Sequence, residues 1–524
     1  MPSFLAAMKW PNSWTRTSML RRMRVSMTIM AGNFKAKPHK IQKFSSSGPG
    51  GGADRLKFWR ISLRISAQPA REESMRGKES LFNIAEQILR AVKADGAEVL
   101  IFAEDSYLTR YANSEIHQNM AISNVNVGVR VRLGKKTGIA WTNRDDRDSL
   151  LDIVRTAETL ASQMPEDPDL PELFSRVELG EVEGAFVEST ANLTPAERAR
   201  TVSRVIEILR PFKAFGVYSS GISEIVYLNT SGSRCYHRVT DVHLSVNAMG
   251  EGGSGWAQIS SRDASSIDPE DVARRARRKA ELSVNPIDVE PGEYTVILEE
   301  LAFSTLLAFM GFMGFSAKSY QEGRSFLLGR LDEKVFSENL TIYDDPLDVR
   351  GFPVGFDFEG VPKKKLVLVD KGVAKNLVYD LKTAAKDGKE STGHALMPFR
   401  SFPYPGHMVV KPGSTSIDEI IRSTERGILV TRFHYTNVIE PRAFVLTGMT
   451  RDGTFLIEDG TLVKGVKNLR FTDSMIDALS SVMAISEDLS LVSDTSWYGH
   501  RFPKGFLVPS VKLERFNFTG KTEF

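Results

Sequence analysis

The sequence predicts an α+β protein in which an N-terminal α+β domain is followed by a C-terminal domain built on a large mixed or antiparallel β-sheet. Three observations favour this class. The first half mixes helical spacing of apolar residues with strict alternation, strand-like runs dominate the second half, and prolines and a glycine interrupt the pattern between them. The chain has 524 residues, 41% of them hydrophobic, which is long enough for more than one core.

The N-terminal domain is predicted to span residues 75–288. Apolar residues at 81–92 recur at helical spacing and predict an amphipathic helix, and 97–103 is typical of a buried strand. Residues 125–133 alternate between valine or leucine and other residues up to a glycine-flanked turn, which predicts a hairpin. We expect further elements in this order: a helix at 149–161, strands at 222–228 and 239–248, a glycine-rich turn at 250–255 and a charged helix at 271–282.

The C-terminal domain is predicted to span residues 289–524. Its first strand, at 294–298, leads into 301–315, which is apolar around the whole helix and contains only small residues between its Leu, Phe and Met side chains. A helix with no polar face must be buried in a core or against another subunit. Short strand-like runs at 365–369, 427–430 and 443–446 and few further helices, after Ser416 and at 473–484, predict a core built on a sheet.

Residues 1–74 are predicted to be a disordered, basic leader, because they contain 14 Lys and Arg against 3 Asp and Glu and no core-forming periodicity. Their apolar runs are shorter than a membrane span and do not form a signal peptide. The favoured interpretation is a translation start placed too early, with Met75 as the true start. A basic tail that binds an acidic partner and an Arg- and Ser-rich transit segment are the alternatives.

The charge distribution and the cysteine content limit which partners and which cellular compartment can be predicted. The rest of the chain has 54 of the 68 basic residues and 62 of the 65 acidic ones, so it is acidic. Nucleic-acid surfaces need clustered Lys and Arg, so we expect no nucleic-acid partner, and no membrane partner either. The single cysteine, Cys235, cannot form an internal disulfide, and a cytoplasmic location is predicted.

No catalytic motif is evident from residue spacing. No two of the eight histidines have the spacing of a zinc-binding helix. His394 and His407 flank a loop rich in Pro and Phe and could meet in space, although hydrogen-bonded loop histidines are the favoured interpretation. A serine-nucleophile turn is missing, the glycines at 250–255 lack the Lys-Ser/Thr ending of a phosphate loop, and the basic run at 274–279 is interpreted as a solvated helix face.

Several ordered blocks of the second half resemble the TldD/PmbA family of peptidase-type proteins. The blocks are Pro291-Gly292-Glu293-Tyr294, Leu340-Thr341-Ile342-Tyr343-Asp344-Asp345-Pro346, Phe356-Asp357-Phe358-Glu359-Gly360-Val361-Pro362, Ser391-Thr392-Gly393-His394 and Pro412-Gly413. The resemblance extends over roughly residues 81–520 of the printed sequence. It implies that the matching motif residues contribute to peptide binding: Asp357, Glu359, Gly360, Ser391, Thr392, Gly393 and His394.

The resemblance also implies where a metal site would lie. In the catalytic branch of the family, the helix after the Pro-Gly-x-Tyr strand contains a His-Glu-x-x-x-His zinc motif, and a later cysteine is the third ligand. Here Ala308, Phe309 and Met313 lie about where that motif would be. We therefore predict no catalytic residue, metal or cofactor in this chain, which is the pattern of the PmbA-like (TldE-like) branch. Zinc is expected in a TldD-like partner, although residues 430–435 and 446–454 look closer to the TldD-like side.

The leading functional hypothesis is a non-catalytic, zinc-less subunit of a TldD/TldE-type metallopeptidase complex that acts on unfolded peptides or small proteins. Its partner would be a TldD-like paralogous subunit, in a hetero-oligomer, or a second copy in a homodimer. Peptides can be held by adding a strand to a sheet edge. One alternative is a self-assembling peptide-binding or scaffold protein without peptidase activity. Another is an enzyme with relocated chemistry that uses His394, His407, Asp357 and Glu359. The older family label, modulator of DNA gyrase, is given little weight because the acidic body has no nucleic-acid footprint.

Overall fold

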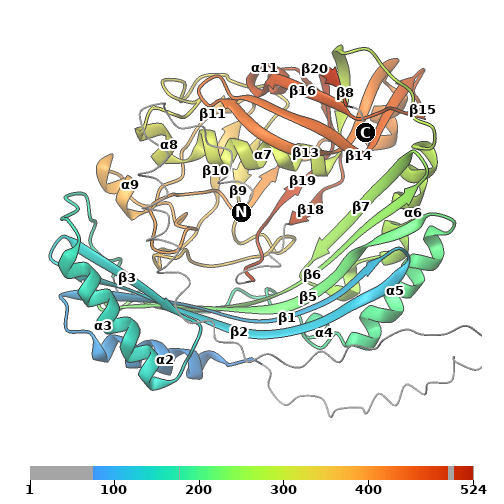
Figure 1. Ribbon diagram of the computed structural model, residues 1–524. Helices are drawn as coiled ribbons and strands as arrows, with labels where there is room; N and C mark the ends of the chain where they lie inside the picture. The colour runs from blue at the N-terminus through green and yellow to red at the C-terminus, as the bar shows by residue number, and fades with distance from the viewer. Residues whose placement is uncertain (1–74, 176, 494–500, 523–524) are drawn as a thin grey trace, which may run out of the picture. The chain divides into compact units, whose positions relative to one another are not determined.

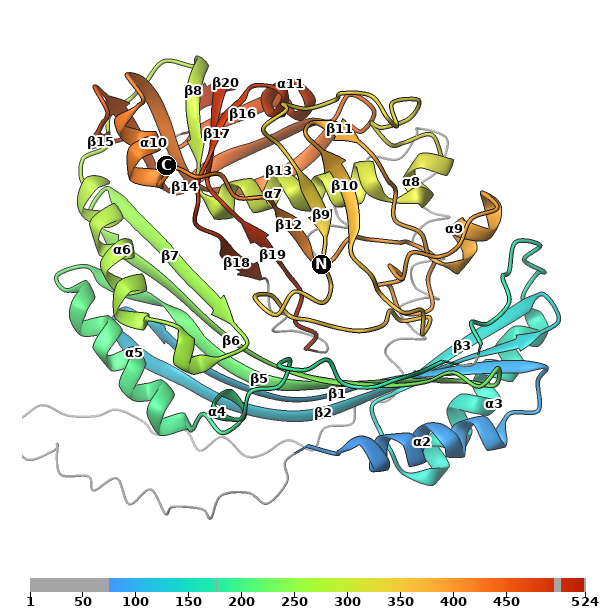
Figure 2. The same ribbon diagram turned by 180° about the vertical axis from the view of Figure 1, so that it is seen from behind.

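The computed structural model describes residues 75–175, 177–493 and 501–522, and residues 73–524 form one compact unit. The predicted disorder of the leader lies outside the described residues. The described part is an α+β protein with three β-sheets, which confirms the predicted class (Figures 1 and 2). The boundary predicted between 288 and 289 falls in the connection between α6 and β8.

The first sheet consists of seven strands in the order β3-β2-β1-β5-β6-β4, with β7 paired to β6. All pairs are antiparallel except the short β4–β6 pair. The strands are β1 (Gly96–Ala112), β2 (Glu115–Leu133), β3 (Lys136–Thr142), β4 (Glu178–Leu179), β5 (Lys213–Asn229), β6 (Arg234–Gly250) and β7 (Gly253–Ser261). The predicted strands at 97–103, 222–228 and 239–248 are therefore only parts of longer strands.

Helices cover one face of this sheet at its two ends (Figure 1). At one end α2 (Lys78–Ala91) and α3 (Arg147–Gln163) bury their apolar stripes against the valines of β2. At the other end α5 (Pro195–Leu209) and α6 (Pro269–Leu282) pack over β5 and β6. The short α4 (Glu188–Ala191) precedes α5. The charged helix expected at 271–282 is α6, and its Ala and Val residues face the sheet while its arginines pair with neighbouring acids.

The second sheet closes on itself. Its order is β13-β8-β20-β16-β14-β15, β13 also pairs with β14, and β17 pairs with β20. The strands are β8 (Gly292–Leu298), β13 (Arg426–Glu440), β14 (Val445–Glu458), β15 (Thr461–Gly465), β16 (Leu469–Ser474), β17 (Val482–Ile485) and β20 (Val511–Lys521). Two short helices, α10 (Ile417–Arg422) and α11 (Met475–Ser480), lie in its connections.

The third sheet has six short strands in the order β11-β10-β9-β12-β19-β18. They are β9 (Ile342–Asp344), β10 (Leu366–Asp370), β11 (Val373–Ala374), β12 (Met408–Val410), β18 (Ser490–Ser493) and β19 (Gly505–Val508). The helices α8 (Ala317–Gln321) and α9 (Leu381–Lys386) lie in long connections of this half, and they are too short for a helical period to be recognised in the sequence.

Between the second and third sheets runs α7 (Glu300–Met310), which continues as a π-helical turn over Gly311–Phe315 (Figure 2). Most of its side chains belong to the largest hydrophobic core, as the apolar sequence predicts. One stripe of the helix, formed by Leu301, Thr305, Ala308 and Phe312, is only half-buried. In the part of the chain that the structure describes, no helix combines the length and the apolar character needed to cross a membrane.

Candidate functional site

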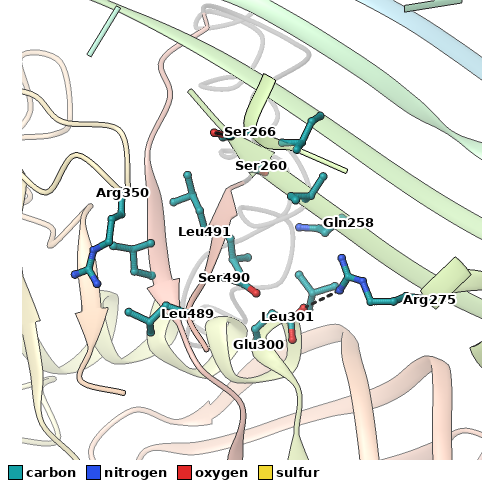
Figure 3. Close-up of a pocket in the computed structure, with 15 residues that line it drawn as sticks. Gln258, Ser260, Ser266, Arg275, Glu300, Leu301, Arg350, Leu489, Ser490 and Leu491 are labelled. Carbon is teal, nitrogen blue, oxygen red and sulfur yellow. Dashed lines mark hydrogen bonds and ion pairs between the residues drawn. The ribbon is translucent and has the colours of Figure 1, made fainter. Parts of the chain in front are cut away.

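A cavity of about 310 Å³ lies between the first sheet and the C-terminal half (Figure 3). It is lined by β7 with the loop that follows it, by the first turn of α7, and by β18 with its neighbour β19. Its apolar side chains are Ile259, Ile267, Leu301, Leu489, Leu491, Val492 and Leu507, and its polar ones are Gln258, Ser260, Ser261, Ser266, Arg275, Glu300, Arg350 and Ser490.

Two strand edges border this cavity. Within the described residues β7 pairs only with β6, and β18 pairs only with β19. The backbone N–H and C=O groups on the other edge of each strand are therefore free of sheet partners. An extended peptide can add to such an edge through main-chain hydrogen bonds, while pockets beside the edge receive its alternate side chains.

Glu300 is the acidic group of the cavity wall. It is the first residue of α7, and burial together with the neighbouring Glu299 carboxylate raises its pKa. Its Oε1 atom lies 4.0 Å from Nη1 of Arg275 (Figure 3). Nε of the same arginine pairs with Asp271 of α6 at 2.9 Å. The cavity thus combines an aliphatic wall with charged groups that already have partners. Such a lining suits a peptide with mixed side chains better than a small ion.

The helix positions at which the resemblance places the zinc motif are filled with apolar side chains. Phe309 and Met313 are buried in the main core, and Ala308 is half-buried on the stripe of α7 described above. Around the π-helical turn, the Phe312 and Phe402 rings lie 4.8 Å apart, and a Cβ atom added at Gly311 would lie 3.0 Å from the Tyr404 ring. None of the three residues offers an imidazole, carboxylate or thiolate, so these positions do not fit zinc. Across residues 75–175, 177–493 and 501–522, no three His, Cys, Asp or Glu side chains are grouped to hold a metal ion.

The predicted motif residues are brought together, but inside the protein and not on the cavity wall. The buried Asp357 carboxylate accepts backbone hydrogen bonds from Glu359 at 2.9 Å, Val361 at 3.0 Å and Ala395 at 2.9 Å. Gly360 has φ +75°, and a Cβ atom there would lie 2.5 Å from the Tyr227 ring. Asp357 and Gly360 therefore fix a tight turn against the first sheet.

The second predicted block, Ser391 to His394, lies directly beside this turn. The hydroxyl of Ser391 donates to the Tyr379 carbonyl, and that of Thr392 accepts from the Tyr379 N–H at 2.7 Å. Lys363 Nζ donates to the Gly393 carbonyl at 3.0 Å. Because Gly393 has φ +74° and a Cβ atom there would approach the Pro362 carbonyl, only glycine fits without strain.

His394 and His407 lie close together, which the sequence analysis considered possible. Both bind the carboxylate of Asp344. Nε2 of His394 lies 3.1 Å from Asp344 Oδ2, and the His407 backbone N–H donates to Oδ1 at 2.7 Å. Burial lowers the pKa of both imidazoles and would raise that of Asp344, but the hydrogen bond and charge of His394 hold the Asp344 pKa well below its usual range. These groups are buried and do not line the cavity. The His394 imidazole fits the hydrogen-bonding interpretation, whereas neither ring nitrogen of the buried His407 has a hydrogen-bond partner among the described residues.

Glu359 connects this region to the first sheet. Its carboxylate accepts from the Leu381 N–H at 2.8 Å and lies 4.0 Å from Arg130 of β2, which is also bound to Glu98 of β1 at 2.7 Å. Burial, with the nearby Asp380 and Asp357 carboxylates, raises the Glu359 pKa to about 8, and burial raises the Asp357 pKa to about 6. The predicted motif residues therefore form a buried polar connection between the two halves. Their contribution to peptide binding stays a prediction.

A second connection, between Arg501 and Asp241, was missed from the sequence. The fully buried Arg501 side chain pairs with Asp241 of β6, and its backbone N–H donates to Glu104 of β1 at 2.7 Å. Gly221 makes room for it, since a Cβ atom there would lie 2.6 Å from Arg501 Nε. The only sequence signal was a charged residue in an otherwise regular strand pattern at Asp241, and a polar residue inside a strand is more often solvent-exposed.

The fold and the cavity define an α+β protein in which two free strand edges border one cavity of about 310 Å³. Family models described as PmbA/TldA metallopeptidase match it in three segments: domain 1 at residues 97–161, the central domain at 185–284 and the C-terminal domain at 291–520. Together they cover most of the chain. The chain belongs to the TldD/PmbA family.

Individual relatives agree with this assignment. The chain is 23% identical to the metalloprotease TldD homolog of Buchnera aphidicola subsp. Acyrthosiphon pisum over 485 residues, which is 83% of this chain and 99% of that protein. It is 29% identical over 300 residues to an uncharacterized protein of Methanocaldococcus jannaschii, covering 56% of this chain and 69% of the relative. The crystal structure of TldE from Thermococcus kodakarensis has the same fold, with a TM-score of 0.73, 21% identity, and coverage of 84% and 100% of the two chains.

Proposed function

We propose that this chain is a subunit of a TldD/TldE-type metallopeptidase complex and that it binds peptide without doing metal chemistry itself. The observation that carries the proposal lies in α7 and the π-helical turn after it: the first turn of α7 lines the cavity, whereas positions 308, 309 and 313 have no metal-binding side chain. The cleaving zinc would then belong to a TldD-like paralogue. We place the complex in the cytoplasm, with which the buried, unpaired Cys235 is compatible.

The substrate class follows from the kind of contact that the cavity offers. A strand edge binds through the peptide backbone, which every sequence shares, so recognition depends on the peptide being extended. Ile259 of β7 and Leu491 of β18 supply apolar contacts on the two sides. In a folded protein most backbone N–H and C=O groups are already paired, so they cannot bind to a strand edge. Unfolded peptides or small unfolded proteins are therefore the expected substrates.

Peptide binding is tested on the chain alone by fluorescence anisotropy with a labelled, extended peptide. Leu491→Asp places a charge in the apolar wall and should weaken binding about tenfold or more, equal to about 1.4 kcal/mol. Val463→Asp is the matched control, because Val463 is an exposed residue of β15 that does not line the cavity. Equal affinities for the two variants would contradict peptide binding in this cavity.

The partner role is tested by co-expressing the chain with a paralogue that contains the His-Glu-x-x-x-His motif, and then measuring mass, zinc content and peptide cleavage. Cleavage and zinc only in the mixed complex would support the proposal. Chelator-sensitive cleavage by this chain alone would contradict it. Peptide binding with no cleavage in either sample would instead favour the second candidate function, a peptide-binding scaffold. The observation that favours it is the outer edge of β2, which among the described residues has no strand partner at 115–126.

A further inference from the structure

Of the three charged side chains that line the cavity, Glu300 has the most distant partner. Arg350 binds Asp348 through Nε at 3.0 Å and through Nη2 at 2.6 Å. Nε of Arg275 binds Asp271 at 2.9 Å. The Glu300 carboxylate lies 4.0 Å from Nη1 of Arg275, which is longer than a hydrogen bond, and no side chain of the described residues donates a hydrogen bond to it. The two arginines are therefore occupied, whereas Glu300 can still accept.

The charges next to Glu300 are paired with one another. The preceding residue, Glu299, binds Lys279 of α6 at 2.6 Å. Since this pair and the two arginine–aspartate pairs are each neutral, the charge left over at the cavity wall is the negative charge of Glu300. Burial and the Glu299 carboxylate raise the pKa of Glu300, so its present neighbours do not compensate for the burial of this carboxylate. A cation that enters the cavity would supply the missing compensation.

An aliphatic surface faces the same cavity. Three leucines that line it are only half-buried, so apolar area remains available to a ligand: Leu301, Leu489 and Leu491. In Figure 3, Glu300 and Leu301 lie between Leu491 on one side of the cavity and Arg275 on the other. Lysine and arginine side chains have a matching division into an apolar stem and a charged head. The cavity thus complements a long basic side chain.

We propose that the cavity is a subsite for a lysine or arginine side chain of the bound peptide, in which Glu300 accepts hydrogen bonds from the cationic head and the leucines pack against the stem. The inference rests on the proposed peptide-binding function and deepens it, because contacts to a strand edge recognise only the backbone. Alternate side chains of an extended peptide point to the same face, so a residue bound at the β7 or β18 edge can direct its side chain into the cavity. An acidic side chain there would face the Glu300 carboxylate and is disfavoured.

The first test compares two peptides that differ at one residue, by fluorescence anisotropy with the full chain. A uniform threonine host with blocked termini and a neutral dye contains a single lysine or, in the matched peptide, norleucine, which keeps the stem and lacks the charge. Because the host is uniform, its register along a strand edge can shift until this residue reaches the cavity. The lysine peptide should bind about tenfold more tightly. Equal affinities would overturn this inference alone, whereas binding of neither peptide would overturn the proposed function with it.

The second test assigns the preference to Glu300. Glu300→Gln keeps the shape of the side chain and removes its charge, so the lysine peptide should bind about tenfold more weakly, with the affinity of the norleucine peptide. The norleucine peptide should keep its wild-type affinity, which also shows that the variant is folded. Glu333→Gln is the matched control and should keep the preference for lysine, because Glu333 is exposed and does not line the cavity. A preference that survives in Glu300→Gln, or that is lost in both variants, overturns the assignment.

Discussion

Arg501 and Asp241 form an ion pair whose two side chains are completely buried, between β6 and the segment that leads into β19. The guanidinium group also donates from Nη1 to the Ser106 hydroxyl at 2.8 Å and from Nη2 to the Ser219 hydroxyl at 3.1 Å, so each of its nitrogens has an acceptor. Replacing only one partner of such a buried pair strongly destabilises a protein, because the other charge is then left unpaired in the interior.

The first prediction concerns this pair. Asp241→Asn should lower the free energy of unfolding by about 3 to 5 kcal/mol, as measured by urea denaturation. Glu293→Gln is the control, because Glu293 pairs with Arg515 at the surface and such pairs contribute at most about 1 kcal/mol. Similar losses in both variants would mean that Asp241 and Arg501 do not connect the halves of the protein.

The second prediction concerns pH. The Glu359 pKa is raised in the folded state to about 8, above its unfolded value of about 4.3. Its favourable contribution to stability is therefore complete below that unfolded value and is lost as the pH rises towards 8 and beyond. Glu359→Gln keeps an acceptor for the Leu381 N–H but cannot ionise. It should be more stable than wild type at pH 8.5 by at least about 1.4 kcal/mol, one pKa unit, and should lose this advantage at pH 5. A difference that does not depend on pH would contradict the assignment.

The third prediction concerns Gly360, which combines a positive φ with contact against Tyr227. Gly360→Ala should destabilise the protein by about 2 to 4 kcal/mol, because both the backbone and the packing oppose a side chain. Gly388→Ala is the matched control: Gly388 has φ +61°, but no atom lies within 4 Å of a Cβ placed there, so only the backbone cost of about 1 kcal/mol remains. Thermal unfolding of the two variants separates these contributions, and equal shifts would show that the Tyr227 contact is unimportant.

The fourth prediction concerns the helix that lacks the zinc motif. If Met313 is ordinary core, Met313→Ala should cost about 2 to 5 kcal/mol through the cavity that it leaves. Met483→Ala, at an exposed methionine of β17, should change stability by less than about 0.5 kcal/mol. Denaturant unfolding measures both. A small loss for Met313→Ala would indicate that the pocket at this position is not tightly packed.

The sequence was informative where a local pattern had a single physical cause. The alternating valines of β2 and the apolar stripe of α2 predicted elements that the structure contains, and the ordered motif blocks predicted the family. Strand ends were predicted poorly. Glu104 and Asp105 continue β1 although they are polar, because the C-terminal half and the neighbouring strands bury them. Because polar side chains usually face water, residue propensities alone do not predict a buried strand at these two residues.

The sequence alone determined the residues at 308, 309 and 313, and with them the lack of zinc-binding side chains at these three positions, since side-chain chemistry does not depend on the fold. Only the tertiary structure decided that the Asp357 and His394 motifs lie in a buried connection between the halves, and that the β7 and β18 edges, about 230 residues apart in the chain, border one cavity. Contacts at such separation follow from how the sheets pack, which no local pattern of residues encodes.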